Sequence, residues 1–414
     1  MRVAVVGAGV SGLVVAHLLH PRHDITVFEA GEYAGGHTNT IRVDTGSETH
    51  DVDTGFIVFN DRNYPNFERL LSRLGVASQP SNMSFSVSDE HGRFEYASTS
   101  LAGLFATPAN RVSPAFHRMV AEVPRFQRAC RALLAEGSWD LSLVDWLSRE
   151  RFSDYFIQRL IVPQAAAVWS ADPRQMWSFP ARFLAEFFHN HGMLALRSRP
   201  RWRVIRGGSA RYVEALTRPF ADRVRLRTPV VSITRAEDHV RVSTAGQESE
   251  RFDEVVIATH SDQALAMLSD ASATERELLG AIHYVANEAV LHTDTRLLPR
   301  RRPAWASWNY HLLDEPRPVA AVTYHMNRLQ ALSSQAEYCV TLNRTEAIDP
   351  AQVIRTISYA HPVFTPAGVR AQARAGEISG VNRTHFCGAY WGWGFHEDGV
   401  VSGLRVAERF GARL

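Results

Sequence analysis

Lysine is absent from this chain of 414 residues, so all 45 of its lysine-plus-arginine positions are arginine. This absence excludes any mechanism that needs a lysine side chain, whether as a Schiff base or as a general base. Cysteine is also scarce: only Cys130, Cys339 and Cys387 occur, and none share a Cys-x-x-Cys spacing. The sequence therefore predicts reduced cysteines of a cytosolic protein, without a zinc or iron–sulfur site.

One histidine pair, His189 and His191, is the other feature that could suggest a metal. No carboxylate or further histidine stands near the pair at ligand spacing, and residues two positions apart do not share a helix face. We therefore predict no metal ion, and we interpret both histidines as packed or cavity-lining side chains.

Long hydrophobic runs and an excess of one charge are missing too. Residues 3–19 are apolar like a signal peptide, but they contain three glycines and no cleavage site. No other segment reaches the ~18 apolar residues that span a bilayer.

The 45 basic and 43 acidic residues nearly balance, which argues against a nucleic-acid partner. We expect a cytoplasmic protein, soluble or peripheral at the inner face of the membrane. Arginine-rich residues 197–206 and 300–302 are either solvated loops or a contact for anionic lipid headgroups.

The first thirty residues carry the most specific pattern: a strand, a glycine-rich loop, a helix and a second strand that ends in an acid. Gly7 permits a tight turn, Gly9 lets backbone approach a pyrophosphate, and Gly12 lets the helix lie close to the sheet. Amide groups at the helix start then face the phosphate. Glu29 can accept hydrogen bonds from both ribose hydroxyls, which disfavours NADP. This pattern predicts a bound adenine dinucleotide.

The rest of the chain predicts an α/β protein with a discontinuous dinucleotide-binding domain and an inserted domain. Residues 255–259 form a continuous apolar run, as in a buried parallel strand, and residues 113–191 have a mainly helical pattern. We assign residues 1–60, 205–265 and 380–414 to the dinucleotide-binding domain, and residues 61–204 and 266–379 to a substrate domain. A final helix is expected from about Gly399 to Phe410.

Four blocks in this order resemble the FAD-dependent amine oxidase, protoporphyrinogen oxidase and carotenoid desaturase superfamily. They are residues 7–29 with Gly35-Gly36, Gly207-Gly208-Ser209, residues 255–259, and residues 388–403. The resemblance implies an amine-oxidase-like fold: a Rossmann-like FAD-binding domain with an inserted α+β substrate domain, and FAD as the cofactor.

The resemblance also implies roles position by position. Residues 36–38 match the segment under the ribityl chain and pyrophosphate, where His37 replaces the arginine of many members. Gly55 and Phe56 match the segment that passes the isoalloxazine, Val230 the backbone position that pairs with adenine, and residues 399–401 the helix start that faces flavin N1 and the C2 carbonyl. The cofactor-binding residues expected in all are Gly7, Gly9, Ser11, Gly12, Glu29, Ala30, Gly36, His37, Thr38, Gly55, Phe56, Val230, Ala258, Gly388, Asp398, Gly399 and Val400.

Two departures from the superfamily pattern bear on function. Ala389 stands where members usually have an acid after the glycine, and Asp398 is our candidate to take over part of that role. The lysine that commonly holds a water at flavin N5 in amine-oxidizing members is missing, so an amine oxidase in the strict sense is disfavoured.

A narrower resemblance points to lipid chemistry. Its motifs are residues 53–60, Tyr64-Pro65, and residues 82–85, 167–170, 190–192 and 388–399. They are similar to bacterial predicted NAD/FAD-binding proteins that are associated with cyclopropane-fatty-acid-synthase-like methyltransferases. One branch of that subgroup is similar to the flavin desaturase of furan fatty acid synthesis, which acts on methyl-branched unsaturated acyl chains.

Candidate catalytic residues lie just before the last helix. His396 is a candidate proton acceptor or a hydrogen-bond partner of the flavin, and Glu397 a candidate base; the alternative is that both cap the helix. The candidate substrate-lining residues are Asn60, Tyr64, His191 and Trp393, although a turn explains Asn60 equally well.

We predict an FAD-dependent oxidoreductase that desaturates an apolar substrate by hydride transfer to flavin N5. The expected substrate is a methyl-branched unsaturated fatty acyl chain of a phospholipid. Two alternatives stay open: a flavin amine oxidase acting on a small amine, and a non-catalytic FAD-binding partner of a lipid methyltransferase.

Overall fold

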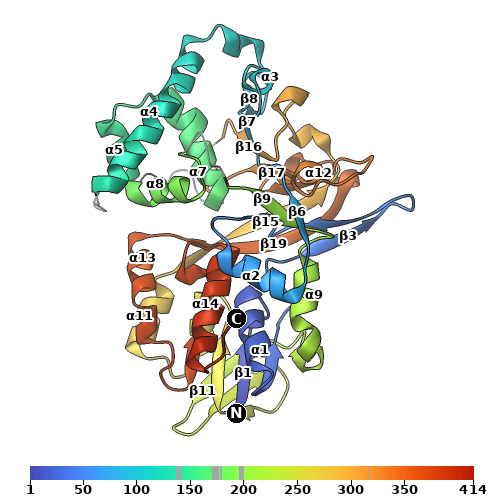
Figure 1. Cartoon of the computed structure of the whole chain (residues 1–414), viewed down its shortest axis with the longest axis vertical. Coiled ribbons are helices and arrows are strands. Elements are labelled where there is room, and N and C mark those ends of the chain that lie inside the picture. The colour runs from blue at the N-terminus through green and yellow to red at the C-terminus, as the bar shows by residue number, and fades with distance from the viewer. Residues whose placement is uncertain (137–140, 170–176, 178–179, 195–199, 316) are drawn as a thin grey trace.

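The computed structural model of the chain describes residues 1–136, 141–169, 177, 180–194, 200–315 and 317–414. Within these ranges the predicted α/β architecture is confirmed. A parallel sheet with flanking helices forms the lower part of the molecule in Figure 1, and a seven-stranded sheet with a helical layer forms the upper part. None of the helices in these ranges combines the length and apolar character needed to cross a membrane.

Five parallel strands from three distant stretches of the chain form the lower sheet. In spatial order they are β10 (Val224–Arg225), β2 (Asp24–Phe28), β1 (Arg2–Val6), β14 (Glu254–Ile257) and β20 (Thr384–Phe386). The carboxyl ends of parallel strands meet at one edge of a sheet. Gly7, Glu29, Ala258 and Gly388, which follow four of these strands, therefore lie along that edge.

A tight turn at Gly7 joins β1 to helix α1 (Val10–Leu19). Gly7 has a φ of 101°, and a Cβ atom there would stand 2.8 Å from the carbonyl oxygen of Ala258. A Cβ atom at Gly12 would stand 2.1 Å from the carbonyl oxygen of Gly7. Both positions thus require glycine, because the turn needs a positive φ and the helix lies directly on the turn.

Helix α14 (His396–Arg409) packs along α1. A Cβ atom at Gly403 would stand 2.7 Å from the carbonyl oxygen of Ser11, so the two helix backbones nearly touch. The expected final helix is present, but it begins three residues before the expected start near Gly399. Asp398 explains the early start: its Oδ2 accepts a hydrogen bond from the Phe395 backbone N–H at 2.9 Å and so caps the first turn.

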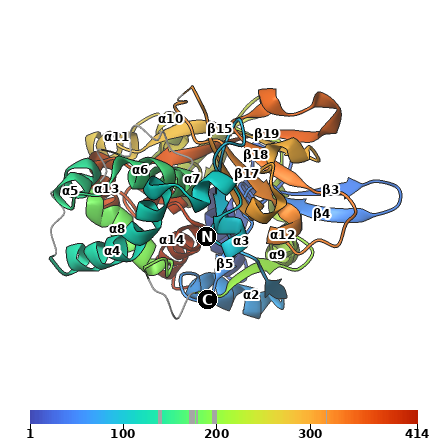
Figure 2. The ribbon, with the colours of Figure 1, turned by 90° about the horizontal axis from the view of Figure 1, so that it is seen from above.

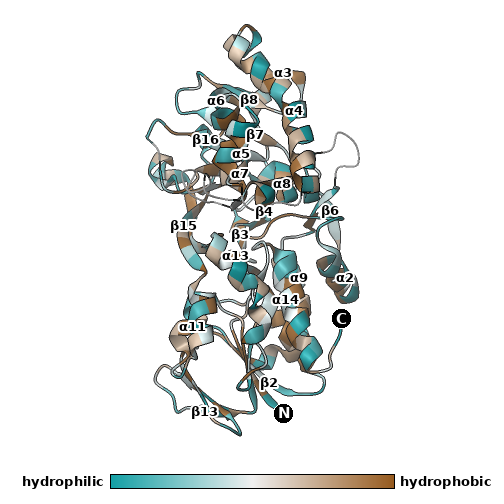
Figure 3. Ribbon diagram, turned by 90° about the vertical axis from the view of Figure 1, so that its left-hand side faces the viewer, coloured by the Kyte–Doolittle hydropathy of each residue, from teal (hydrophilic) through white to brown (hydrophobic). Residues whose placement is uncertain are grey.

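The upper sheet is mixed and is covered by helices on one side. Its strands, in spatial order, are β19 (Val353–Val363), β15 (His283–His292), β18 (Cys339–Leu342), β17 (Val322–His325), β16 (Trp308–Leu312), β7 (Phe85–Asp89) and β8 (Glu95–Ala97). Figure 2 shows α4 (Pro114–Glu136), α5 (Leu143–Arg149), α6 (Asp154–Phe156) and α8 (Ala181–Asn190) gathered together on one side of the molecule. Figure 3 shows both teal and brown residues on α4 and α14, as expected for helices with one buried face.

Smaller elements complete the fold. Three short sheets comprise β11 (Val230–Arg235), β12 (Val240–Thr244) and β13 (Glu250–Phe252); β3 (Thr40–Asp44) and β4 (Thr49–Asp53); and β5 (Phe59–Asn60), β9 (Trp202–Ile205) and β6 (Ser78–Pro80). Further helices are α2 (Pro65–Leu74), α3 (Leu101–Leu104), α7 (Val162–Trp169), α9 (Ala210–Thr217), α10 (Ser261–Met267), α11 (Ala273–Gly280), α12 (Met326–Leu329) and α13 (Pro366–Ala373).

Helix α2 bears on the domain division. We assigned it to the substrate domain, but its buried residues Phe67, Leu70 and Leu71 belong to the same hydrophobic cluster as α1, α9 and α14. The helix therefore packs with the nucleotide-binding part, and the boundary at residue 60 stays a prediction.

A buried carboxylate, Asp53, joins the two parts of the molecule. Its Oδ1 accepts hydrogen bonds from the Ser209 backbone N–H at 2.8 Å, the Ser209 hydroxyl at 2.7 Å and the Thr40 hydroxyl at 2.6 Å. Its Oδ2 accepts a hydrogen bond from the Gln330 amide at 3.1 Å. Burial raises the pKa of Asp53 to about 6 against the effect of these donors. One carboxylate thus holds the Gly-Gly-Ser turn against the end of α12.

We expect Gly403→Ala to lower the free energy of unfolding by about 1–3 kcal/mol, because its methyl group would force α1 and α14 apart. Gly376→Ala is the matched control, since a Cβ atom there meets nothing within 4 Å. Denaturant unfolding of both variants measures the difference. Equal stability of the two would contradict the close packing of these helices.

Candidate functional site

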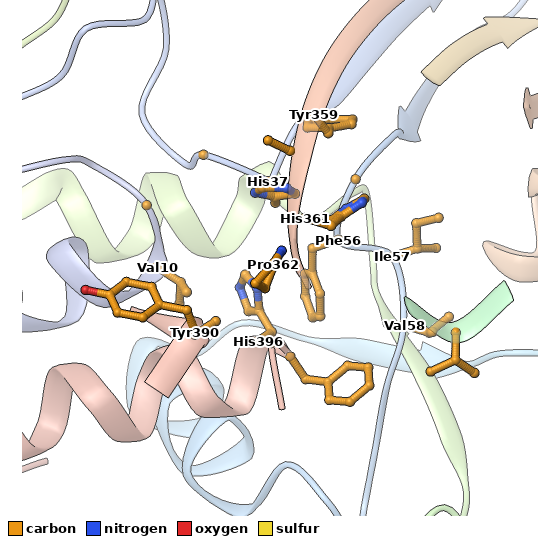
Figure 4. Close-up of a pocket in the computed structure, with 18 of the residues that line it drawn as sticks. Val10, His37, Phe56, Ile57, Val58, Tyr359, His361, Pro362, Tyr390 and His396 are labelled. Carbon is orange, nitrogen blue, oxygen red and sulfur yellow. The ribbon is translucent and has the colours of Figure 1, made fainter. Parts of the chain in front are cut away.

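A cavity of about 1600 Å³ extends from the carboxyl edge of the parallel sheet into the upper part of the molecule. Its nucleotide end is lined by Gly9 and Glu29, and its middle by His37, Phe56 and His396. Figure 4 shows the side chains of the middle, which come from segments far apart in the sequence and face a common space. The apolar end lies in the upper part, between α4, α8 and the seven-stranded sheet.

The Glu29 carboxylate is held in place by backbone donors at the nucleotide end. Its Oε2 accepts a hydrogen bond from the Ala8 N–H at 2.8 Å, and its Oε1 accepts one from the Gly31 N–H at 2.8 Å. Each carboxylate oxygen has a second lone pair. Glu29 can therefore accept hydrogen bonds from two ribose hydroxyls without losing its present partners.

The start of α1 is open to the cavity. Gly9 is its N-cap, no side chain caps the helix, and its first turn contains no acid. A Cβ atom at Gly9 would meet no protein atom within 4 Å, whereas one at Gly36 would stand 3.2 Å from the Cα of Gly9. The loop with Gly35 and Gly36 thus crosses closely beside Gly9 and leaves the helix amides facing open space, as an anion site requires.

Four histidines, His37, His260, His361 and His396, line the middle of the cavity and its border with the nucleotide end. The His37 ring centroid lies 5.3 Å from that of His361 and 6.2 Å from that of His260. Burial lowers the pKa of all four; it falls to about 4 for His361, to about 3 for His396, and well below its usual value for His37. All four imidazoles are therefore neutral at physiological pH.

His37 has a polar atom that the described protein leaves unpaired. Its Nε2 is fully buried and has no hydrogen-bond partner among the described residues. A ligand hydroxyl, which can donate or accept a hydrogen bond, would complete the pairing for either ring tautomer.

His396 is the most constrained of the four histidines. Its ring stacks on Phe56 with 3.7 Å between centroids and 9° between planes. Its Nε2 lies 2.6 Å from the hydroxyl of Tyr212, and that hydroxyl lies 2.6 Å from the Thr38 hydroxyl. Tyr212 is fully buried, so this polar chain is closed to water.

The hydrogen bonds among Thr38, Tyr212 and His396 determine which ring nitrogen of His396 carries the proton. The hydroxyls of Thr38 and Tyr212 bring two protons, and their only described acceptors are each other and Nε2 of His396. Both protons find acceptors only if Nε2 accepts a hydrogen bond. An unpaired buried hydroxyl proton costs ~1–3 kcal/mol. The ring proton therefore sits on Nδ1, and we infer that His396 offers a hydrogen-bond donor to the cavity, the second of the two roles considered for it.

Glu397 is not in a position to act as a base, so that assignment was wrong. Its Oε1 accepts hydrogen bonds from the Asn66 backbone N–H at 3.0 Å and the Asn66 side-chain amide at 2.7 Å, and its Oε2 accepts one from the Phe67 N–H at 2.9 Å. The carboxylate caps the start of α2 and faces away from the cavity. Burial raises the pKa of Asp398 to about 6, but its capping contact likewise gives it a structural role.

The predicted substrate residues divide into two pairs. Tyr64 and His191 line the cavity, whereas Asn60 accepts hydrogen bonds from the N–H groups of the next residues 62 and 63 through its Oδ1. Trp393 packs on Phe183, with ring centroids 4.3 Å apart. For Asn60 the turn explanation is the one observed, and Trp393 is a packing residue.

Most of the predicted cofactor residues reach the cavity. Those that line it are Gly7, Gly9, Ser11, Glu29, Ala30, Gly36, His37, Gly55, Phe56, Val230, Ala258 and Gly388. Gly12, Thr38, Asp398, Gly399 and Val400 do not; the amide of Gly399 is bonded within the helix to the Phe395 carbonyl at 3.2 Å, and Val400 is fully buried. Residues 399 and 400 were misplaced because the helix starts earlier.

Four residues that the site description uses had not been predicted: Tyr212, His260, Tyr359 and His361. No local motif marks them, because each lies in or at the start of an ordinary helix or strand and reaches the site only through the fold. Ser170, Arg197 and Arg199, which belong to predicted motifs, lie outside the described residues. The part of the chain that the structure describes contains no group of three histidine, cysteine or acidic side chains placed to hold a metal.

The apolar end of the cavity is lined mainly by hydrocarbon and aromatic side chains. Among them are Met83, Phe126, Leu160, Val168, Phe188, Met193 and Trp308. Glu29, at the opposite end, is the only carboxylate among the described lining residues. Beyond the middle of the cavity there is thus no described acid to pair with a cationic substrate.

Comparison with known proteins decides the family. The model of the family "flavin containing amine oxidoreductase" matches residues 10–324, which is most of the chain. The chain belongs to the flavin-containing amine oxidoreductases. FAD fits the cavity: Glu29 has lone pairs for a ribose, Gly9 leaves space at a helix N-terminus for the pyrophosphate, and the unpaired Nε2 of His37 can take a ribityl hydroxyl.

The names of similar proteins state different substrates. An L-amino-acid oxidase of Mus musculus is 27% identical over 320 residues, which cover 73% of this chain and 48% of that protein; the chain thus spans about half the length of this relative. Putrescine oxidase with bound putrescine has a TM-score of 0.70 at 14% identity, covering 99% of both chains. A fatty acid isomerase from P. acnes has a TM-score of 0.69 at 15% identity, covering 99% of this chain and 98% of the other. The two structural likenesses show a shared fold.

We expect Gly9→Ala to weaken FAD binding by about tenfold or more, because the methyl group would occupy the space of the pyrophosphate at the helix start. The unfolding midpoint of the FAD-free protein should not change, since the methyl group meets no protein atom. Titration with FAD by fluorescence quenching measures the affinity, with Gly376→Ala as the control. Unchanged affinity in Gly9→Ala would place the pyrophosphate elsewhere.

We expect His396→Asn to preserve the visible spectrum of bound FAD better than His396→Gln. Asparagine carries an amide where Nδ1 stands, whereas glutamine carries it near Nε2. Nitrogen NMR of histidine-labelled protein, with His396→Asn identifying the signal, reports directly which ring nitrogen is protonated. A proton found on Nε2 of His396 would refute the tautomer assigned above.

Proposed function

We propose that this protein is an FAD-dependent oxidoreductase that desaturates a fatty acyl chain. The observation that supports this proposal is the composition of the cavity beyond Phe56 and His396. Its described lining is mainly apolar, with polar amides at Gln127 and Gln164, and contains no carboxylate, and the chain has no lysine. An uncharged hydrocarbon is the substrate class that such a wall accommodates without leaving a buried charge unpaired.

When bound, the flavin would accept a hydride from the substrate. The proton that the desaturation also releases would pass to a neutral imidazole in the middle of the cavity, such as that of His361. The residues of this chain position the substrate beside the cofactor and keep water out of the cavity. The aromatic and aliphatic side chains at the apolar end exclude water from the reacting carbon atoms. His396 directs an N–H into the middle of the cavity, where it can stabilise negative charge on a neighbouring acceptor atom.

Methyl-branched unsaturated chains are the most specific substrates that we propose. The motifs at residues 53–60 and 388–399 support this choice through their similarity to the desaturase branch described above. The fatty acid isomerase is a further protein of this fold that acts on an acyl chain. A methyl branch next to a double bond weakens the adjacent C–H bonds, which favours loss of a hydride.

An amine oxidase is the second candidate, and the family match favours it. The names of two similar proteins give L-amino acids and putrescine as their substrates. An ammonium group desolvated in this cavity would have no described carboxylate beside it. A non-catalytic partner of a lipid methyltransferase is the third candidate, and it would bind FAD without being reduced by any of these compounds.

The deciding experiment is anaerobic reduction of the FAD-loaded protein. We expect phospholipids with methyl-branched unsaturated chains, dispersed in detergent, to bleach the long-wavelength flavin band. Straight-chain saturated phospholipids, putrescine and L-amino acids should leave it unchanged. Bleaching by an amine alone would establish the second candidate, and bleaching by dithionite but by no organic compound would favour the third.

A variant at the apolar end supplies a control. Leu160 lines this end, so Leu160→Asn should slow bleaching by lipid by about tenfold, since it buries a polar amide without a partner. Reduction by dithionite should be unaffected in this variant. If lipid bleaches both proteins at the same rate, the acyl chain does not occupy this end of the cavity.

A further inference from the structure

Residues 98–118 form a protruding end of the upper part, which we call the tip. It consists of α3, a 3₁₀ turn at Pro108–Arg111 and the first turn of α4. Figure 1 places α3 and the neighbouring start of α4 at the end of the molecule opposite the N-terminus. Nothing in the proposed chemistry requires such a projection.

Apolar side chains are exposed on the tip. Leu101 is 76% exposed and Val112 is 81% exposed, which makes them the two most exposed large apolar residues in the described part of the chain. Their support is rigid, because Phe105 packs on the fully buried Phe116 with 5.9 Å between ring centroids. Ser100 also caps α3 by accepting a hydrogen bond from the Gly103 N–H at 3.0 Å. An ordered segment thus presents two hydrocarbon side chains to the solvent.

The charge of this surface has one sign. Between Glu95 and Glu122 the sequence contains no acidic residue, while Arg111, His117 and Arg118 are exposed. Glu95 itself is buried and is paired with the side chain of Arg301 at 2.9 Å. The tip is therefore basic, with its nearest carboxylate already neutralised.

A second segment without acids adjoins the tip. Residues 295–313 contain four arginines and no acidic residue. They touch α3, since a Cβ atom at Gly103 would stand 2.8 Å from the carbonyl oxygen of Pro303. Arg302, which is exposed and belongs to the 3₁₀ turn that contacts α3, thus extends the basic surface of the tip, whereas the Arg300 side chain lies against Gly92. Hydrocarbon groups ringed by arginines fit the interface of an anionic bilayer.

The cavity reaches the base of the tip. Ser98, the first residue of the tip, and Val123, five residues after its end, both line the cavity, and Ser98 is also exposed to solvent. Val123 lies on α4 one residue before Pro124 and close to Phe126 of the apolar end. A bilayer in contact with the tip would therefore lie next to the end of the cavity that suits an acyl chain.

We propose that the tip is a docking surface for anionic lipid bilayers, with Leu101 and Val112 inserted among the acyl chains and the surrounding arginines on the headgroups. This docking surface would give the proposed desaturase its lipid substrate directly from the bilayer. Only this link to the substrate rests on the proposed function. The basic residues 300–302 take part in this surface, as one of the two interpretations of their sequence anticipated.

Sedimentation with vesicles tests the docking surface. The FAD-loaded protein should sediment with phosphatidylcholine vesicles that contain phosphatidylglycerol, and less with pure phosphatidylcholine. The double variant Leu101→Ser/Val112→Ser should lower the affinity for the anionic vesicles by about tenfold or more. Arg111→Gln/Arg302→Gln should weaken binding and reduce its dependence on salt.

The control is Leu226→Ser/Val381→Ser, which makes the same two substitutions at residues 40% and 46% exposed on the lower part. It should bind vesicles like the unmodified protein. Absence of binding to anionic vesicles, or equal binding by the tip variant, would overturn the proposal. Bleaching of the flavin by lipid in detergent does not need docking, so its failure would count against the proposed function and leave the docking surface standing.

Discussion

The close contact between the first and last helices of the chain is the constraint on which the site depends. Gly403 allows α14 to rest on the backbone of Ser11, and Gly399 leaves room for the side chain of Val10. Both helices consequently begin at one cavity, with Gly9 and His396 in its lining. Helix N-termini carry partial positive charge. Two such termini converge here although the residues that form them are nearly four hundred positions apart in the chain.

This convergence explains how the site can bind an anionic group with few cationic side chains. The arginines among the described lining residues are Arg201 and Arg203, which belong to β9 and the segment before it. At the nucleotide end the open amides of α1 supply the positive potential for a pyrophosphate. His37, in the place of an arginine, is neutral because burial lowers its pKa. A pyrophosphate bound at the nucleotide end would therefore be met by backbone amides, and a ribityl chain beside His37 would meet an uncharged ring.

The parts of this arrangement that could be predicted from sequence are those encoded locally. The glycines of residues 7–12 and the acid at position 29 specify a turn, a helix start and a strand end within one short unit. Glu397 lies 331 positions from its partner Asn66, and Tyr212 lies 184 from His396; no local pattern relates such pairs. The start of α14 was misplaced because Gly399 resembles a helix boundary, whereas the glycine serves packing and Asp398 provides the cap.

Neutrality in the middle of the cavity bears directly on the choice of substrate. Four imidazoles kept neutral by burial mark a region of low polarity, where an unpaired ammonium would lose its hydration without a compensating carboxylate. A C–H bond has no hydration to lose. The same burial that lowers the histidine pKa values thus disfavours a charged amine and leaves a hydrocarbon chain unaffected, so the electrostatics of the middle and the apolar wall beyond it favour the same class of substrate.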